Sequence, residues 1–353
     1  MTQSLWDLAV KQSHLRLSKT RFRESYVVFA GCQTCGKSTI INSFLEKDET
    51  SRKTLALEYT FGRRSRVPYA PKSIVHVWEL GGGVKFSHLL DVTVSRDSVE
   101  NLCFVVVLDL SVPQELWTHL THLLTAYGAR IQNVLKNVSL KFDSSFERTV
   151  INRTLQRLNS DHPDHELRTV FPIPLVIIGS KYDLFLKFKS EDQELISKSL
   201  RFVANLYGSA LFFANASDVA ITKKIKSYLY HLAFEFAKPN STPVFENGPL
   251  NILPGQDSFS LIGPPPTGSA VKRSNDCTLL ELWESVFCKR FLQTPILTST
   301  GATKPHMDEV YAEPQVDLAR QSKDEEFDRC RRQSEHLMQE QLKQAEDNGL
   351  VVM

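Results

Sequence analysis

Short apolar runs alternate with amphipathic segments over residues 25–238. Apolar runs that end in glycine or polar residues are typical of buried strands, and apolar residues at three-to-four spacing are typical of helices. The strands predicted in this way are Tyr26–Ala30, Thr54–Phe61, Ile74–Leu80, Leu102–Leu110, Leu175–Gly179 and Ala210–Ala214. Strands that alternate with helices predict a doubly wound α/β domain with a mostly parallel sheet.

The regions outside this alternation have a different composition. About 60 residues separate the fourth and fifth predicted strands, more than one crossover helix needs, so residues 129–170 are predicted to be a mostly helical insertion. An N-terminal helix is predicted at residues 1–24 and a short amphipathic helix at residues 276–292. Between the domain and the second helix, the Pro/Gly-rich residues 239–275 predict an extended linker. Residues 293–353 are polar and charged, which predicts a partly disordered tail.

Composition and charge narrow the function classes. The 42 Lys and Arg residues against 40 Asp and Glu residues give a net charge of +2, which does not favour a partner made of nucleic acid or acidic lipid. No apolar run approaches the roughly 18 residues of a membrane span, and the N-terminus has no signal-peptide core. The 6 cysteines are scattered, which is typical of a reducing compartment. We expect a soluble protein without membrane insertion and without a nucleic-acid partner.

The strongest chemical signal is Gly31-Cys-Gln-Thr-Cys-Gly36-Lys37-Ser38, a match to the phosphate-loop pattern G-x4-G-K-S. It follows a predicted strand and precedes a helical run, as the mechanism requires. The glycines let the backbone wrap a phosphate, the helix N-terminus points N–H groups at it, and the lysine adds positive charge. The candidate phosphate-binding residues are Gly31, Gly36, Lys37, Ser38 and Thr39, with Ser38 also the candidate magnesium ligand if a nucleotide is bound.

The same loop carries a C-x-x-C pair, Cys32 and Cys35. A zinc or redox site needs a second pair or a thioredoxin-like context, and the sequence offers neither. We therefore expect the backbone of these two residues to matter more than their sulfur atoms.

A second motif follows the fifth predicted strand. Ser180-Lys181-Tyr-Asp183 resembles the N-K-x-D segment with which GTPases bind guanine, with serine in place of asparagine. In that segment the Asp accepts hydrogen bonds from guanine and the Lys packs along the base. Lys181 and Asp183 are the candidate base-binding residues, and the candidate ligands are GDP or GTP with Mg²⁺, an empty site being the alternative.

The positions that support hydrolysis in GTPases depart from the usual pattern. Trp78-Glu79-Leu-Gly-Gly-Gly83 resembles the W-D-x-x-G segment, but Glu79 replaces Asp and Gly83 stands where a small GTPase keeps its water-orienting Gln. Gln33 occupies a loop position that is usually glycine, and Phe213-Ala-Asn-Ala-Ser217 matches a base-contacting S-A-K motif only at Ala216. We expect no catalytic residue and little or no hydrolysis.

One further cluster offers metal-ligating side chains: Asp161, His162, Asp164 and His165. A solvated turn around Pro163, with Asp164 capping a helix, is the commoner arrangement of such a cluster. We expect that arrangement here.

Several whole segments resemble the light intermediate chains of cytoplasmic dynein 2, the motor of retrograde intraflagellar transport. The resemblance runs over most of residues 1–290. The segments that carry it are Thr54-Leu-Ala-Leu-Glu-Tyr-Thr-Phe-Gly-Arg-Arg64, Val77-Trp-Glu-Leu-Gly-Gly-Gly83, Asp161-His-Pro-Asp-His-Glu-Leu167, Pro172-Ile-Pro-Leu-Val-Ile-Ile-Gly-Ser-Lys-Tyr-Asp183 and Leu200-Arg-Phe-Val-Ala204.

The resemblance implies a non-catalytic subunit whose Ras-like P-loop domain packs on the tail of the dynein heavy chain and stabilises it. It also implies a role in assembling and maintaining cilia, and a location in the cytoplasm and in the cilium, axoneme and basal body. The implied partners are the dynein 2 heavy chain and other dynein 2 subunits, with the intraflagellar transport machinery as an indirect partner. The helix at Leu279–Phe287 is expected to pack against a partner, and residues 317–347 are expected to be an exposed helix or a segment that becomes helical on a partner.

Two other hypotheses stay open at this point. The first is a regulatory GTPase whose nucleotide state gates a partner, which the residues at Gly83 and Gln33 disfavour. The second is an ATP-dependent enzyme that uses the phosphate loop alone, which the segment Ser180–Asp183 disfavours.

Overall fold

The computed structural model describes residues 24–49, 54–64, 73–141, 144–158, 162–215, 218–234, 236–239, 242–245, 248–266, 278–295 and 314–347. The chain divides into two compact units, residues 1–296 and residues 297–353. The helix predicted at residues 1–24 lies outside the described residues, apart from Glu24, which begins the first strand.

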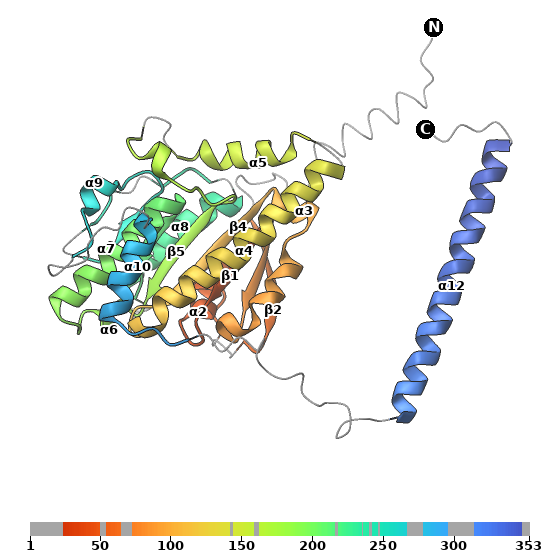
Figure 1. Ribbon diagram of the computed structural model, residues 1–353, viewed down its shortest axis with the longest axis horizontal. Coiled ribbons are helices and arrows are strands. Elements are labelled where there is room, and N and C mark those ends of the chain that lie inside the picture. Colours follow the sequence, from red (N-terminus) through yellow and green to blue (C-terminus); the bar gives the residue numbers. More distant parts are fainter. Residues whose placement is uncertain are drawn as a thin grey trace, which may run out of the picture. The chain divides into compact units, whose positions relative to one another are not determined.

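The first unit is built on a seven-stranded sheet of order β2-β3-β1-β4-β5-β6-β7 (Figure 1). The five inner strands are parallel, and β2 and β7 pair antiparallel at the two edges. All the predicted strands are confirmed, with ends that shift by at most three residues. This order, with β2 reversed and a phosphate loop after β1, is that of a Ras-like domain. The strands are β1 (Glu24–Gly31), β2 (Leu57–Arg64), β3 (Ser73–Leu80), β4 (Leu102–Asp109), β5 (Leu175–Ser180), β6 (Ala210–Phe213) and β7 (Asn251–Ile252).

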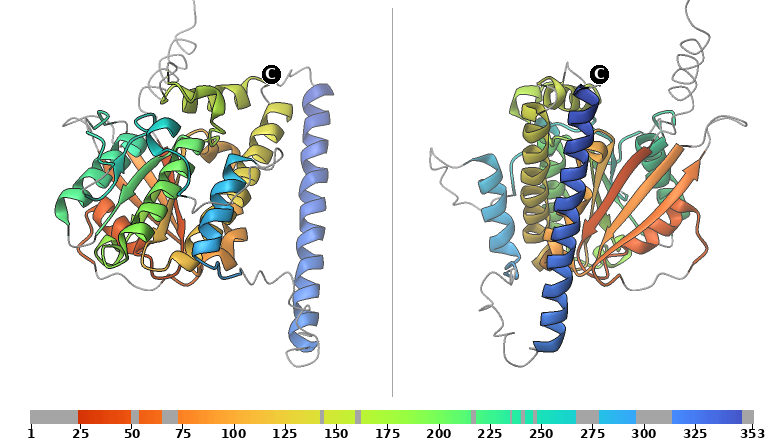
Figure 2. Two further views of the ribbon diagram at one scale, coloured as in Figure 1. Left: turned by 60° about the vertical axis from the view of Figure 1, so that its left-hand side comes forward. Right: turned by 90° about the vertical axis from the view of Figure 1, so that its right-hand side faces the viewer.

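Helices cover both faces of the sheet, because the inner strands carry apolar side chains on both sides. In β4 every residue is buried: Phe104 and Val106 face one apolar cluster, and Val105 and Val107 face the other. The second face is covered by α2 (Lys37–Leu45) and α8 (Val219–Phe234) (Figures 1 and 2). The first face is covered by η1 (Gly83–Thr93), α3 (Arg96–Val99), α4 (Pro113–Lys141), α5 (Phe146–Leu155), α6 (Tyr182–Phe185), α7 (Ser190–Tyr207), α9 (Phe259–Ile262) and α10 (Leu279–Arg290).

The region predicted as an insertion, residues 129–170, is mostly helical. Its first part is not a separate element, however, because residues 129–141 are the second half of α4, a helix of 29 residues. The remainder holds α5 and the short helix η2 (His165–Leu167).

The prediction of an extended linker over residues 239–275 is wrong for its described part. The backbone N–H of Phe213 donates to the carbonyl of Leu250 at 2.8 Å, and β7 then pairs with β6. Ser258 caps α9, in which Ile262 is buried. Pro and Gly are typical of tight turns as well as of linkers, and a two-residue strand is too short to show a period.

The amphipathic helix predicted at residues 276–292 is observed as α10, which begins with a capping box between Thr278 and Glu281. Apolar side chains of this helix pack inside the same domain. Trp283 stacks on Phe202 with 5.2 Å between ring centroids, and Phe287 lies 5.5 Å from Trp117. Trp283 and Phe287 are buried and so complete the core of their own domain, whereas Leu279 is 57% exposed; packing of this helix on a partner stays a prediction.

The segment after α10 is fastened to the start of α4 by Gln293. Its side-chain oxygen accepts from the backbone N–H groups of Trp117 and Thr118, at 3.1 and 3.2 Å. Its amide nitrogen donates to the carbonyl of Pro113 at 3.0 Å. Trp117 and Thr118 are the fifth and sixth residues of α4, so Gln293 gives their N–H groups an additional acceptor and holds this segment against the helix.

In the second unit the structure describes one helix, α12 (Pro314–Asp347). Its apolar residues Val316, Leu318 and Phe327 are exposed, as expected for residues 317–347. None of the helices in the described ranges is long and apolar enough to cross a membrane.

Candidate functional site

The phosphate loop leaves the carboxyl end of β1 and leads into α2. Gly31 has φ +151°, and a Cβ there would lie 1.9 Å from the carbonyl oxygen of Val107 on β4. Gly36 has φ +85° and directly precedes α2. The close approach of two strands and the left-handed turn therefore require glycine at these positions.

Lys37 is buried and lies inside the loop. Its ammonium group donates to the carbonyl of Cys32 at 2.7 Å and to that of Gly31 at 3.4 Å, with the sulfur of Cys35 at 3.7 Å. The positive charge thus lies among the groups that surround the phosphate position of such a loop.

The next residue, Ser38, donates its hydroxyl hydrogen to Glu79 Oε1 at 2.7 Å. Glu79 is at the end of β3 and is buried, and burial raises its pKa above the usual range, while the hydrogen bond from Ser38 opposes that rise. Both side chains line an open cleft of about 630 Å³ between α2, residues 47–49 and β2. Two hard oxygen ligands side by side fit the preference of Mg²⁺, so glutamate can do here what aspartate does in the usual motif.

Different constraints favour glycine at the three positions Gly81, Gly82 and Gly83. A Cβ at Gly81 would lie 2.4 Å from the carbonyl oxygen of Thr54, and one at Gly82 would lie 2.2 Å from the ring of Phe86. At Gly83 the nearest atom would be Gln33 N at 3.7 Å, but the backbone has φ +67°. Position 83 therefore faces the phosphate loop with room for a side chain and a backbone that disfavours one.

The candidate base-binding residues lie at the carboxyl end of β5. Lys181 Nζ donates to Asp109 Oδ2 at 2.5 Å, and Ser180 Oγ donates to the carbonyl of Leu108 at 3.0 Å. Asp183 is exposed in the first turn of α6. Ser180 thus ties β5 to β4, whereas Asp183 is exposed at the cavity described next.

A cavity of about 450 Å³ brings much of the predicted site together. Of the predicted residues it is lined by Gly36, Thr39, Lys181 and Asp183, while Ser38 lines the cleft on the other side of the loop. Sequence reasoning did not include Lys226 of α8, which also lines the cavity and pairs with Glu46 at 2.7 Å. Of the segment expected to contact a base, Asn215 lines the cavity, and residues 216–217 lie outside the described ranges.

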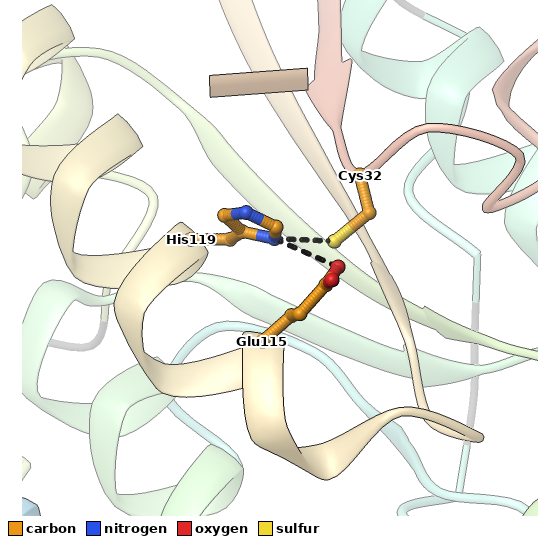
Figure 3. Close-up of side chains that lie close together, drawn as sticks. All are labelled: Cys32, Glu115 and His119. Atoms are coloured by element: carbon orange, nitrogen blue, oxygen red, sulfur yellow. Dashed lines mark hydrogen bonds and ion pairs between the residues drawn. The ribbon is translucent and has the colours of Figure 1, made fainter. Parts of the chain in front are cut away.

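The sulfur of Cys32 points away from the loop and toward α4, where it meets two side chains. Its Sγ lies 2.8 Å from His119 Nδ1, and that nitrogen lies 3.7 Å from Glu115 Oε2 (Figure 3). Burial raises the pKa of the Cys32 thiol to about 12 and lowers the pKa of His119. We call Cys32, Glu115 and His119 the thiol cluster. The backbone of Cys32 is expected to matter more than its sulfur, and the structure shows that the sulfur also makes contacts of its own.

The expectation of a solvated turn at residues 161–165 is wrong for its buried members. Asp164 is 6% exposed and accepts from Asn205 Nδ2 at 2.8 Å, and it does not cap η2 with its side chain. His162 Nε2 lies 2.8 Å from the carbonyl of Asp257. Asp161 lies outside the described residues.

Asp257 completes this second cluster. It forms two hydrogen bonds with Arg201, at 2.8 and 2.9 Å, and both side chains are 5% exposed. We call His162, Asp164, Arg201, Asn205 and Asp257 the anchor cluster, because it fixes the segment around α9 to α7. Among the described residues, the thiol cluster is the group of His, Cys, Asp and Glu side chains whose ligand atoms converge as a metal site requires.

The known proteins that this chain resembles are dynein light intermediate chains. The sequence profile of the family described as Dynein light intermediate chain (DLIC) matches residues 1–156. The cytoplasmic dynein 2 light intermediate chain 1 of Bos taurus is 39% identical over 340 residues, which cover 94% of this chain and 96% of that protein. Its counterpart in Homo sapiens is 38% identical with the same coverage. A crystal structure of the conserved domain of a dynein light intermediate chain matches with a TM-score of 0.53 at 17% identity, over 75% of this chain and 98% of that one, which is a likeness of fold.

Proposed function

The chain belongs to the dynein light intermediate chain family, and on that premise we propose that it is a non-catalytic accessory subunit of the cytoplasmic dynein 2 motor. The subunit associates with the dynein 2 heavy chain and stabilises it for retrograde intraflagellar transport and for the assembly and maintenance of cilia. The proposed location is the cytoplasm and the cilium, including the axoneme and basal body. The names of relatives that match nearly the whole chain support this assignment.

The observation that carries the non-catalytic assignment is the contrast within the nucleotide site. The phosphate loop keeps its glycines and its buried Lys37, whereas position 83 has no side chain to orient water. Hydrolysis in this class of proteins depends on positioning, so a site without the positioning group is expected to turn over slowly or not at all. This supports a domain that serves as a folding unit and a docking surface.

We propose that the retained site holds GDP or GTP when it is occupied. Gly31, Gly36, Lys37, Ser38 and Thr39 would hold the phosphates, with Ser38 and Glu79 as the oxygen ligands available to Mg²⁺. Lys181 and Asp183 would hold the base at the cavity between α2 and α8. A bound guanine nucleotide supplies phosphate and base contacts and no chemical step in this proposal.

The proposed docking surface for the heavy chain is the aromatic face of β2 and β3. Tyr59 and Phe61 on β2 are each 48% exposed. Tyr59 lies 4.9 Å from the Trp78 ring and 2.8 Å from His76 Nδ1, so neighbouring aromatic side chains form a continuous patch. Exposed aromatic residues held by rigid strands are typical of protein interfaces.

The test is recovery of the heavy chain from ciliated cells by a tagged copy of the protein, with bound proteins and retained nucleotide identified by mass spectrometry. Lys37→Ala and Asp183→Asn test the nucleotide site, and the exposed Asp183 makes the second variant safe for the fold. Phe61→Ser tests the docking face, with Leu140→Ser, 84% exposed on α4, as its control.

The proposal expects both nucleotide-site variants and the Leu140 variant to recover the heavy chain like the wild type, and the Phe61 variant to lose most of it. Failure of the wild type to recover any dynein heavy chain would overturn the subunit assignment. If the folded Asp183→Asn variant alone loses the heavy chain, nucleotide controls assembly, and the regulatory GTPase hypothesis replaces the scaffold.

A further inference from the structure

The three side chains of the thiol cluster bring three electron-pair donors to one point. The Cys32 sulfur, His119 Nδ1 and a carboxylate oxygen of Glu115 all lie within 4.8 Å of one another. Cys32 comes from the phosphate loop, whereas Glu115 and His119 lie one turn apart on the same face of α4 (Figure 3). The Cys32 thiol and His119 Nδ1 form a hydrogen-bonded pair, and with the Glu115 carboxylate they bring three atoms of metal-ligand type to one point.

We propose that the thiol cluster is a binding site for a divalent transition metal of the zinc class. Thiolate, imidazole and carboxylate are the ligand types that Zn²⁺ uses in proteins. One thiolate and one carboxylate together balance the two positive charges, which matters because Cys32 is 3% exposed. This inference does not depend on the proposed dynein function.

The geometry is close to what the metal needs. A tetrahedral zinc about 2.3 Å from sulfur and about 2.0 Å from nitrogen or oxygen holds its ligand atoms roughly 3.4–3.6 Å apart. The Nδ1–Oε2 distance of 3.7 Å fits, and the Sγ–Nδ1 distance of 2.8 Å has to widen by under about 1 Å. Glu115 is 41% exposed, so its carboxylate can make a small adjustment, and the fourth position is left to a water molecule.

The surroundings of the ligands also fit. The His119 side chain is only 18% exposed, so a metal bound to its Nδ1 would be largely shielded from water. The backbone N–H of Asp109 donates to the Cys32 sulfur and so helps to hold it in place. When the sulfur–metal bond forms, the thiol proton leaves to solvent, and no oxidation or reduction takes place.

A metal at this point would tie the phosphate loop to α4. Cys32 and His119 are 87 positions apart in the sequence, and the same Cys32 accepts the hydrogen bond from Lys37 through its carbonyl. A cross-link between such distant residues restricts the unfolded chain and so stabilises the native state. The position of the lysine inside the loop is thereby coupled to the metal.

The test is a titration of the full-length protein, reduced and freed of metal by a chelator, with Co²⁺ as a spectroscopic probe and Zn²⁺ as the competitor. The proposal expects one equivalent of Co²⁺ with thiolate-to-cobalt charge-transfer absorption, displaced by Zn²⁺. Cys32→Ser should abolish the charge-transfer absorption. His119→Gln should weaken binding by at least the roughly 10–100-fold that loss of an outer-shell partner costs.

Matched controls are present in the same elements. Cys35→Ser removes the other buried sulfur of the loop, and His122→Gln removes a histidine of α4 that contacts Ser87 instead of the cluster. Both variants should titrate like the wild type. Because Glu115 is partly exposed, Glu115→Gln keeps the test open if the cysteine variant does not fold, and it should weaken binding and change the visible cobalt spectrum.

A wild-type protein without charge-transfer absorption, or a Cys32→Ser variant that titrates like the wild type, would overturn the proposal. In the first case the cluster is a hydrogen-bonded contact only. In the second case the metal binds another cysteine, such as the exposed Cys330.

Discussion

The anchor cluster and the thiol cluster are both groups of polar side chains in a mostly apolar domain, yet they are built on different principles. In the anchor cluster, carboxylates meet donors: Asp257 accepts from Arg201, and Asp164 accepts from Asn205 and from the backbone N–H of Phe259. In the thiol cluster, the Cys32 thiol is hydrogen-bonded to His119, and a carboxylate oxygen of Glu115 is the third atom of metal-ligand type at the same point. Burial of polar groups alone therefore does not mark a binding site. What distinguishes the thiol cluster is that three atoms of metal-ligand type converge on one point.

Arg201→Ala should have the largest effect, and it should fall on stability alone. The substitution leaves the Asp257 carboxylate buried without its partner, which costs about 3–5 kcal/mol of the free energy of unfolding. Denaturant unfolding of the full-length protein measures this cost, with Arg290→Ala, which removes an exposed pair with Asp192, as a control that should change little. Equal stability of the two variants would contradict the anchoring role.

The candidate nucleotide site should show the opposite behaviour, a loss of ligand with no loss of fold. Asp183→Asn replaces an exposed acceptor, so the melting temperature should stay the same. If guanine nucleotide binds here, loss of a charge-assisted hydrogen bond should weaken GDP binding by about 1.5–3 kcal/mol, or roughly 10–100-fold. Calorimetric titration with GDP measures this, and Asp218→Asn, at the start of α8 and outside the cavity lining, is the matched control. Unchanged GDP affinity in the Asp183 variant would remove this residue from the site.

Neither cluster could be predicted from the sequence, whereas much of the fold could. The parallel strands and the phosphate loop could be predicted, because apolar runs and a glycine pattern are local signals. His162 and Asp164 are neighbours in the sequence, which suggested a surface turn, and their burial depends on Asp257 nearly a hundred residues away. Glu115 and His119 show a helical spacing, but nothing local connects them with Cys32. Contacts between distant segments decide the role of each residue, and a single sequence does not contain them.

Gln293→Ala tests whether the segment after α10 stabilises the start of α4, where Glu115 and His119 of the thiol cluster lie. The substitution removes the hydrogen bonds between the Gln293 side chain and Trp117, Thr118 and Pro113, which should cost about 0.5–1.5 kcal/mol of unfolding free energy. Because Trp117 and Thr118 lie between Glu115 and His119 on α4, Co²⁺ binding should weaken as well if the thiol cluster holds a metal. Gln293→Glu, which keeps an acceptor at the helix N-terminus, should restore most of the stability. A variant with wild-type unfolding would show that water replaces the side chain at no cost.

The smallest expected effect concerns Glu46, which pairs with Lys226 and Arg64 at the rim of the nucleotide cavity. Hydrogen bonds from Lys226, the larger contribution, and from Arg64 lower the pKa of Glu46 from 4.5 to about 2. A lowered carboxyl pKa stabilises the fold above pH 4.5, and this contribution is lost as the pH falls from 4.5 toward about 2. The side chain is 46% exposed, so solvent screens the pair and the contribution should be only about 0.2–1 kcal/mol. Unfolding free energies of wild type and Glu46→Gln, measured from pH 6 to the acid limit of reversible unfolding, should differ above pH 4.5 and converge below it. A gap that does not narrow with acid, or that is unaffected by added salt, would mean that the substitution acts through packing and not through charge.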